Sequence, residues 1–254
     1  MKPRTRIRWA GALVVSLASL CLLAATCPDE VYFAYSEARR WISAAGPLSQ
    51  IPAAKPAESV PCPSATPTQP PGRVLPDQYF PPGVLRCGGW LDGFVMDWYT
   101  GQLKALAEPS LWALSRNRRQ GDVYRFLWLR TFHNPIAVRL IVNPDMTGVV
   151  IAKVANGKGG YEPGRLVRGD SHPVGRNGTA LLQIRLREAN FWNAPPGGLP
   201  GGADGARWIV EGLSNGRYQV VDSWSPIKSD PIYRLGMTFL ADLAGLNVAG
   251  DELY

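Results

Sequence analysis

The pentapeptide Gly212-Leu213-Ser214-Asn215-Gly216 matches the Gly-x-Ser-x-Gly pattern of a serine nucleophile on a sharp turn between a strand and a helix. Such a serine needs an acid and then a histidine further along the chain to activate its hydroxyl. No histidine follows Ser214. Asn215-Gly216 is also the pair that a two-residue type I′ turn favours, because both turn positions need a positive φ. The pentapeptide therefore predicts a β-hairpin rather than a hydrolase site.

The predicted hairpin gathers charged and aromatic side chains on one face. Pairing outward from the turn places five of them together: Arg207, Glu211, Tyr218, Asp222 and Trp224. An arginine over an indole, beside two carboxylates, is suited to binding a ligand through cation–π and charge-assisted contacts. An exposed sheet face whose charges cancel would account for the same residues. Both interpretations stay open, whereas the opposite, apolar face belongs in the core.

Two further motifs favour structural roles. The loop Gly157-Lys158-Gly159-Gly160 lacks the Ser or Thr that follows the lysine of a phosphate-binding loop, so it predicts a flexible strand connection. Residues 168–171 spell RGDS, which animal adhesion receptors recognise. Such a short motif recurs by chance, and Gly-Asp is common in ordinary turns. We therefore expect a turn at this position.

The histidines and cysteines do not show the number and spacing of ligands that a metal centre needs. His133 and His172 belong to no HExxH motif and to no paired-cysteine spacing, so we expect neither a metal nor a cofactor. Asp170 precedes His172 by two positions, but nothing else supports general-base catalysis there. Both histidines are expected on the surface or in turns.

The net charge of +7 is concentrated at the N-terminus, where Lys2, Arg4, Arg6 and Arg8 precede an uncharged run over residues 9–26. A run of roughly 18 residues can span a bilayer as a helix. A basic flank before it is typical of an export signal or membrane anchor. Residues 1–27 are therefore a retained anchor, a cleaved signal peptide or, through Cys27, a lipidation site. Each alternative places the rest of the chain outside the cytoplasm.

The next two segments predict a helix and a spacer. Residues 28–45 carry acidic residues first and arginines late, as helix ends favour, and predict a membrane-proximal helix. Residues 46–76 are rich in Pro, Ala, Ser and Thr and predict an extended linker. Cys62 and Cys87 are a candidate disulfide in an oxidising compartment, with two unpaired thiols as the alternative.

Residues 77–254 predict one globular domain. Its 19 Lys and Arg nearly balance its 16 Asp and Glu, and its basic cluster at residues 116–119 lacks interleaved aromatics, so we expect no nucleic-acid partner. Periodicity predicts helices at 91–106, 179–192 and 231–246, strands at 123–132, 136–143, 148–155 and 166–168, and then the hairpin. This order predicts an α+β domain, an antiparallel sheet of about five or six strands with helices packed on one face.

Four stretches together carry a resemblance to a known group of proteins: YRFLWLRTFHNPIAVRL, GGYEPGRLV, ADGARWIVEG and GRYQVVDSWSP. They resemble an uncharacterised family of bacterial envelope proteins, exported or membrane-anchored, over about residues 90–246. The family has no established activity, so the resemblance implies no catalytic or binding residue. It implies a single domain in a bacterial cell envelope, anchored in the inner membrane and facing the periplasm, or exported after signal cleavage.

We expect a membrane-tethered extracytoplasmic domain that binds a protein or cell-wall partner and is not an enzyme. The mixed hairpin face is its predicted contact. The alternative is an envelope enzyme acting on peptidoglycan or glycan through carboxylates such as Asp204, Glu211 and Asp222. Such a pair of carboxylates needs a cleft and a defined separation. A structural or immunity-type protein with one cognate partner is a third possibility.

Overall fold

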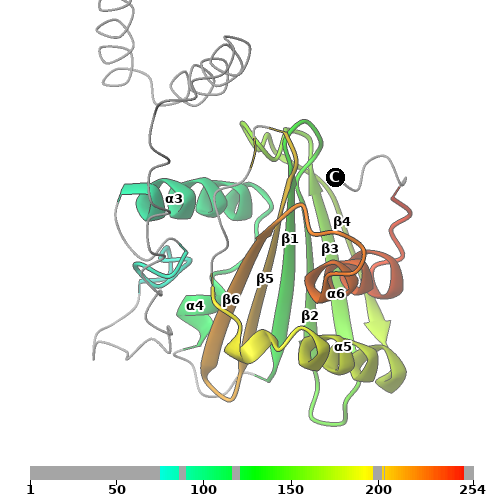
Figure 1. The fold of residues 1–254 in the computed structure, drawn as a ribbon. Helices are drawn as coiled ribbons and strands as arrows, with labels where there is room; N and C mark the ends of the chain where they lie inside the picture. Colours follow the sequence, from blue (N-terminus) through cyan, green and yellow to red (C-terminus); the bar gives the residue numbers. More distant parts are fainter. Residues whose placement is uncertain (1–74, 86–89, 116–120, 197–201, 203, 249–254) are drawn as a thin grey trace, which may run out of the picture. The chain divides into compact units, whose positions relative to one another are not determined.

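The computed structural model describes residues 75–85, 90–115, 121–196, 202 and 204–248. Within them lies one six-stranded antiparallel sheet with the order β4-β3-β2-β1-β5-β6 (Figure 1). Its strands are β1 (Val123–Arg130), β2 (Ile136–Val142), β3 (Gly148–Ala155), β4 (Leu166–Val174), β5 (Ala206–Ser214) and β6 (Arg217–Trp224). The antiparallel α+β architecture predicted from the sequence is therefore confirmed.

The hairpin of β5 and β6 has the predicted turn and register. Ser214 pairs with Arg217, and Arg207 pairs with Trp224 at the far end. Asn215 and Gly216 have φ values of 50° and 77°, the two positive angles that a type I′ turn requires. β4 is longer than the predicted strand at 166–168, because it pairs along the whole of β3. The RGDS run therefore lies in a strand, not in a turn. His172 also lies in this strand, and it is exposed, in agreement with the expected surface position.

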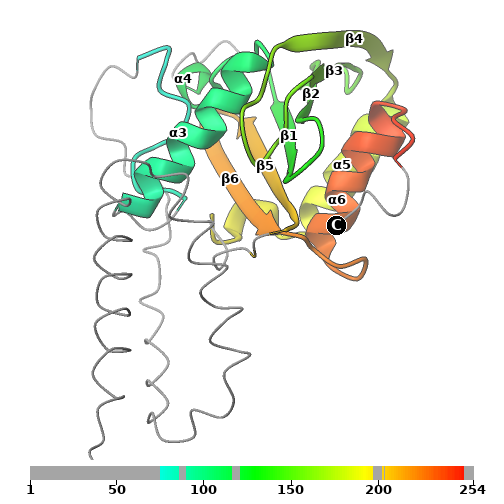
Figure 2. The ribbon, with the colours of Figure 1, turned by 90° about the horizontal axis from the view of Figure 1, so that it is seen from above.

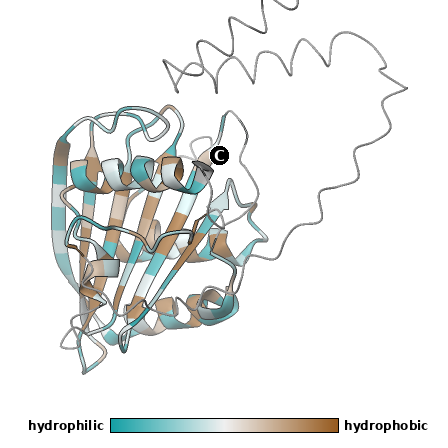
Figure 3. Ribbon diagram, turned by 90° about the vertical axis from the view of Figure 1, so that its left-hand side faces the viewer, coloured by the Kyte–Doolittle hydropathy of each residue, from teal (hydrophilic) through white to brown (hydrophobic). Residues whose placement is uncertain are grey.

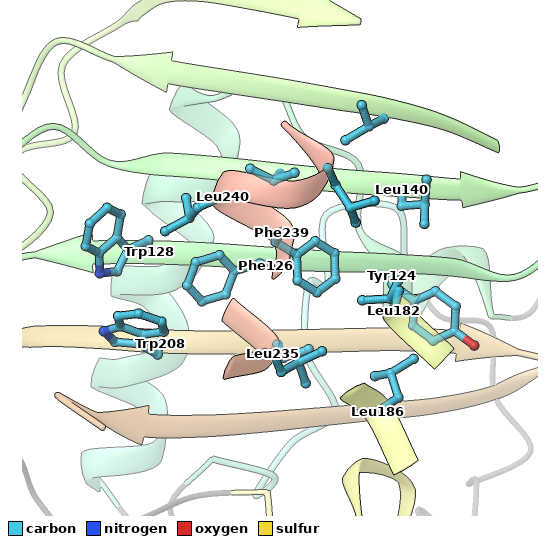
Figure 4. Packing of buried hydrophobic residues seen from close by; sticks show 14 of the residues in the cluster. Tyr124, Phe126, Trp128, Leu140, Leu182, Leu186, Trp208, Leu235, Phe239 and Leu240 are labelled. Carbon is cyan, nitrogen blue, oxygen red and sulfur yellow. The ribbon is translucent and has the colours of Figure 1, made fainter. Parts of the chain in front are cut away.

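The first face of the sheet packs against α5 (Arg176–Glu188), α6 (Pro231–Met237) and the π-helical segment η2 (Thr238–Leu243). α5 ends before the predicted boundary because Asn190, with φ 44°, adopts the left-handed conformation that ends helices. Phe126 stacks on Phe239, with ring centroids 5.9 Å apart, and also contacts Trp208 (Figure 4). Hydrophobic positions recur along the strands that carry this core (Figure 3).

The second face packs against α3 (Trp90–Ala105) and the short α4 (Leu111–Leu114). Tyr99 and Leu103 of α3 lie against Leu127 and Ile209 of the sheet in a second hydrophobic cluster. Helices therefore cover both faces, as Figure 2 shows, which corrects the prediction that they pack on one face. The physical reason is visible in β1, VYRFLWLR: every residue is buried, as expected of a strand covered on both sides rather than one.

Several sequence-based expectations lie outside the described residues. They are the anchor or signal at 1–27, the helix at 28–45, most of the linker at 46–76, the cysteines Cys62 and Cys87, and the basic cluster at 116–119. Among the residues that the structure does describe, no helix has the length and apolar character needed to cross a bilayer.

Two helical glycines provide a matched test of the packing on the first face. A Cβ at Gly236 of α6 would lie 2.4 Å from the Trp208 ring and 3.0 Å from Phe126, whereas one at Gly101 of α3 would meet nothing within 4 Å. We expect Gly236→Ala to lower the free energy of unfolding by about 1–3 kcal/mol through overpacking. Gly101→Ala should raise it by up to about 1 kcal/mol through helix propensity. Urea unfolding followed by tryptophan fluorescence measures both, and equal stabilisation by the two variants would contradict this packing.

Candidate functional site

The five residues predicted as a contact face lie together on one side of the hairpin, but that side is covered by α3 and α4. The exposed fractions of Arg207, Glu211, Tyr218 and Asp222 are 6%, 0%, 5% and 2%, and Trp224 is partly buried. The sequence pattern left two interpretations of this face, a ligand-binding face or a face in contact with solvent. Among the described residues, this side of the hairpin is covered, so it is open neither to a ligand nor to solvent. The pattern located the residues correctly but could not show the second helical layer.

Three of these residues form the smaller of two polar clusters. The Arg207 guanidinium lies over the Trp224 ring, 4.9 Å from its centroid, so the predicted cation–π contact is present. Its Nη1 lies 3.5 Å from Asp222, and the Tyr99 hydroxyl donates a hydrogen bond of 3.0 Å to Asp222. These contacts tie α3 to the hairpin. Because Arg207 is buried and paired, Arg207→Ala would disturb the fold as well as any contact.

The larger cluster is built around Arg125, a fully buried arginine in the middle of β1. Its Nε and Nη2 donate to Glu211 Oε2 at 2.8 and 2.5 Å, and its Nη1 donates to the Pro109 carbonyl at 2.6 Å. The Tyr218 hydroxyl donates to Glu211 Oε1 at 2.8 Å. Arg125 and Glu211 are direct cross-strand partners, so the register of β1 and β5 creates this ion pair.

Glu108 completes this cluster from the segment between α3 and α4. β1 and β2 place Arg125 directly opposite Arg139, a juxtaposition of like charges that would be unfavourable alone. Glu108 Oε2 lies 2.7 Å from Arg139 and 3.5 Å from Arg125, and Oε1 lies 3.0 Å from Lys153 of β3. One buried carboxylate therefore offsets three cations from three strands.

The two glutamates differ in their titration. Burial raises the pKa of Glu108, but the charges of Arg125 and Arg139 and hydrogen bonds from Arg139 and Lys153 outweigh it and leave that pKa lowered. Burial dominates at Glu211 and raises its pKa despite the Arg125 charge. Burial and the Glu211 carboxylate likewise raise the pKa of Tyr218 well above its ordinary value.

A raised carboxyl pKa is one property of a general acid, but the surroundings of Glu211 do not suit catalysis. Its Oε2 accepts from Arg125, its Oε1 accepts from Tyr218, and its side chain has no exposed surface. Asp222 is also buried, whereas Asp204 is exposed. The three carboxylates proposed for an enzyme therefore do not share one solvent-facing environment.

The sequence pattern missed Arg125, Glu108, Arg139 and Lys153. Arg125 carried a usable signal, because a charge inside the otherwise apolar run before Arg130 at the end of β1 must find a buried partner when the strand is covered on both faces. The identity of that partner could not be read from sequence, since Glu211 lies 86 residues away and meets Arg125 only through strand pairing.

The glycine-rich loop joins β3 to β4, as predicted, but it is held by hydrogen bonds, whereas a flexible connection was expected. Its glycines permit close packing. A Cβ at Gly159 would lie 2.7 Å from the backbone of Arg130, and one at Gly160 would lie 2.9 Å from that of Thr131. The Trp98 indole donates to the Gly159 carbonyl at 2.9 Å, and the Gln102 amide donates to the Tyr161 carbonyl, also at 2.9 Å. α3 thereby fixes this loop against the end of β1.

Tyr161 of this loop and three aromatic side chains from neighbouring segments form what we name the aromatic patch: Phe94, Trp98, Phe132 and Tyr161. Phe132 and Tyr161 stack with centroids 6.1 Å apart and are 47% and 49% exposed. Phe94, 45% exposed, lies against Trp98 with centroids 6.5 Å apart. The two ring pairs are linked through the Gly159–Tyr161 backbone that Trp98 and Gln102 hold.

The remaining candidates have structural positions. The His172 ring nitrogen Nε2 lies 2.8 Å from the Leu243 carbonyl, which joins β4 to η2. His133 follows β1 in the turn where it was expected. Within the described part of the chain, no group of three or more His, Cys, Asp or Glu side chains is arranged to hold a metal ion.

No protein-family model matches the chain, and no curated protein matches its sequence.

Glu108→Gln should destabilise the protein by about 3–5 kcal/mol near neutral pH, because it leaves buried cations without their carboxylate. Since the folded-state pKa of Glu108 is lowered, its contribution is complete above the unfolded pKa of about 4.3 and is lost as pH falls through the folded value. Glu211, with a raised pKa, contributes in the opposite sense: its stabilisation is present at low pH and lost as pH rises through the folded value.

The free energy of unfolding of Glu108→Gln should therefore fall less on acidification than that of the wild type. Urea unfolding between neutral pH and about pH 3 measures this difference. Glu188→Gln is the control, because Glu188 pairs with Arg185 on the surface and its ion pair is screened by solvent. An unchanged acid limb in Glu108→Gln would contradict the assigned role of Glu108.

Proposed function

We propose that the chain is a membrane-tethered extracytoplasmic domain that binds a protein or cell-wall partner through the aromatic patch. The observation that carries the proposal is the exposure of three aromatic side chains, Phe94, Phe132 and Tyr161, beside a glycine-rich loop that is held by hydrogen bonds. Phe94, Phe132 and Tyr161 leave close to half of their surfaces in water, although each could contribute substantially if covered. Grouped exposed aromatics of this kind are typical of interaction sites.

The loop that carries Tyr161 is held in place before any partner arrives. Trp98 and Gln102 fix the glycine-rich loop from one side, and the carbonyls of Thr131 and His133 accept hydrogen bonds from Gly160 and Gly159 on the other. A contact surface ordered in advance loses less conformational entropy on binding. Flat aromatic faces can cover apolar side chains of a protein or the apolar face of a sugar ring.

The hairpin residues have a supporting part in this proposal. Arg207 and Asp222 anchor α3 through Tyr99, and α3 in turn carries Phe94 and Trp98. Two of the five predicted contact residues therefore help to position the part of the aromatic patch that α3 carries. Trp224 is the member of that set with partly exposed surface.

The tether rests on the sequence alone. The basic residues before the uncharged run at 9–26 support a membrane anchor or export signal, and the Pro-rich segment at 46–76 supports a spacer that holds the domain away from a bilayer. The near balance of charge over residues 77–254 supports a partner other than nucleic acid.

The enzyme alternative is favoured by one observation, the raised pKa of Glu211. A separate experiment tests this alternative. Incubation of the full chain with purified peptidoglycan should then release soluble fragments, and Glu211→Gln should abolish that release. We expect no such release, because both carboxylate oxygens of Glu211 are already hydrogen-bonded inside the protein.

A photo-crosslinking amino acid at Phe132 in the native envelope should capture the partner of the aromatic patch. The matched control carries the same label at Ile227, which is 71% exposed but lies outside the aromatic patch. Mass spectrometry identifies the captured protein or cell-wall fragment. A specific adduct at Phe132 and none at Ile227 is expected, whereas equal labelling at both positions would remove the support for the patch.

Tyr161→Ala should weaken binding of the captured partner by about 30-fold or more, the effect of a central interface residue. Ile227→Ala should leave the affinity unchanged. Because both side chains are largely exposed, neither variant should shift the unfolding midpoint appreciably. Equal affinities for wild type and Tyr161→Ala would show that the partner binds elsewhere.

A further inference from the structure

The two edges of the sheet differ in how they are covered. At the β6 edge, Asp222 donates its backbone N–H to the Pro196 carbonyl, and the Gln219 amide donates to carbonyls of residues 191–194. At the other edge, β4 pairs with β3 and with no other strand of the described residues (Figure 2). All eight residues from Leu166 to Pro173 are exposed. A long exposed edge strand offers its free backbone groups to another strand.

Pro173 shows which backbone groups of β4 point outward. Pro173 pairs with Val149 of β3, and a proline has no N–H to give to that ladder. Pro173 and Val149 therefore form a non-hydrogen-bonded pair. In an antiparallel ladder such pairs alternate with hydrogen-bonded pairs along the strand. Ser171 and Gly169 therefore also direct their N–H and C=O groups away from β3. These groups face the open edge.

The outward backbone of Gly169 lies at the centre of a self-complementary sequence. If a second β4 runs antiparallel with Gly169 opposite Gly169, Arg168 of each copy lies opposite Asp170 of the other. Both side chains are more than half exposed, and within one chain Arg168 Nε already donates to Asp170 Oδ2. Across the seam the four charges would alternate in sign, and opposite charges in facing positions stabilise a strand pair.

We propose that β4 is a homodimerisation edge, through which two copies join their six-stranded sheets into one continuous antiparallel sheet centred on Gly169. An interface made by one strand edge is smaller than that of a tight complex, so association in dilute solution is weak. Tethering of both copies in one membrane would raise their effective concentration and favour the dimer. The β4 edge shares no residue with the aromatic patch, so either surface can lack its partner while the other binds.

Charge exchange tests the register directly in the full chain, in membranes or detergent micelles. Arg168→Asp or Asp170→Arg alone places like charges opposite each other and should weaken dimerisation by about tenfold. The double variant Arg168→Asp/Asp170→Arg restores opposite charges across the same two-fold axis and should recover the wild-type dimer. Chemical crosslinking in membranes and sedimentation in micelles measure the dimer fraction over a range of protein concentrations.

Two further variants separate the proposed edge from general effects. Arg187→Asp makes the same charge change on the exposed face of α5 and should leave the dimer unchanged. Gly169→Pro removes an outward N–H and should abolish dimerisation, while tryptophan fluorescence of the core reports an intact fold. A monomeric wild type at every concentration would overturn the proposal. So would single charge variants that dimerise normally, or a double variant that fails to recover.

Discussion

The buried charge of Arg125 is the constraint on which the rest of the structure depends. A guanidinium in the middle of an apolar strand is very unfavourable unless ionised and hydrogen-bonding partners surround it. Glu211 supplies that partner from β5, and the Pro109 carbonyl supplies another from the chain after α3. A slip of one residue between β1 and β5 would turn Arg125 and Glu211 to opposite faces of the sheet. The ion pair therefore specifies the register of the central strands.

The same cluster fixes the second layer of the molecule. Glu108 holds the segment between α3 and α4 to β1, β2 and β3, and the Tyr79 hydroxyl donates to its carbonyl at 2.8 Å. α3 is thereby set over the sheet, where it orders the glycine-rich loop and carries half of the aromatic patch. Helices cover both sheet faces, so the two surfaces that we propose for partners lie elsewhere. The aromatic patch lies at one end of the sheet, and β4 lies at one edge.

The sequence was sufficient for the hairpin and insufficient for the buried network. Asn215-Gly216 determines its turn through backbone conformation alone, so the hairpin and its register could be predicted. Whether the mixed face of the hairpin meets solvent depends on α3, more than 100 residues away, and no local pattern contains that information. The prediction of helices on one face was wrong, although the nearly unbroken apolar composition of β1 is typical of a strand that is covered on both faces. The aromatic patch depends on three separate segments meeting, which only the fold shows.

The strand order has a consequence for how the chain folds. Neighbouring strands from β1 to β4 are consecutive in sequence, as are β5 and β6, so these pairings close only short loops. The pairing of β1 with β5 instead joins segments separated by β2, β3, β4 and α5. Long-range pairings of this kind lose the most chain entropy and slow folding the most. Docking of the β5–β6 hairpin onto β1, with the meeting of Arg125 and Glu211, is thus the topologically costly step of assembly.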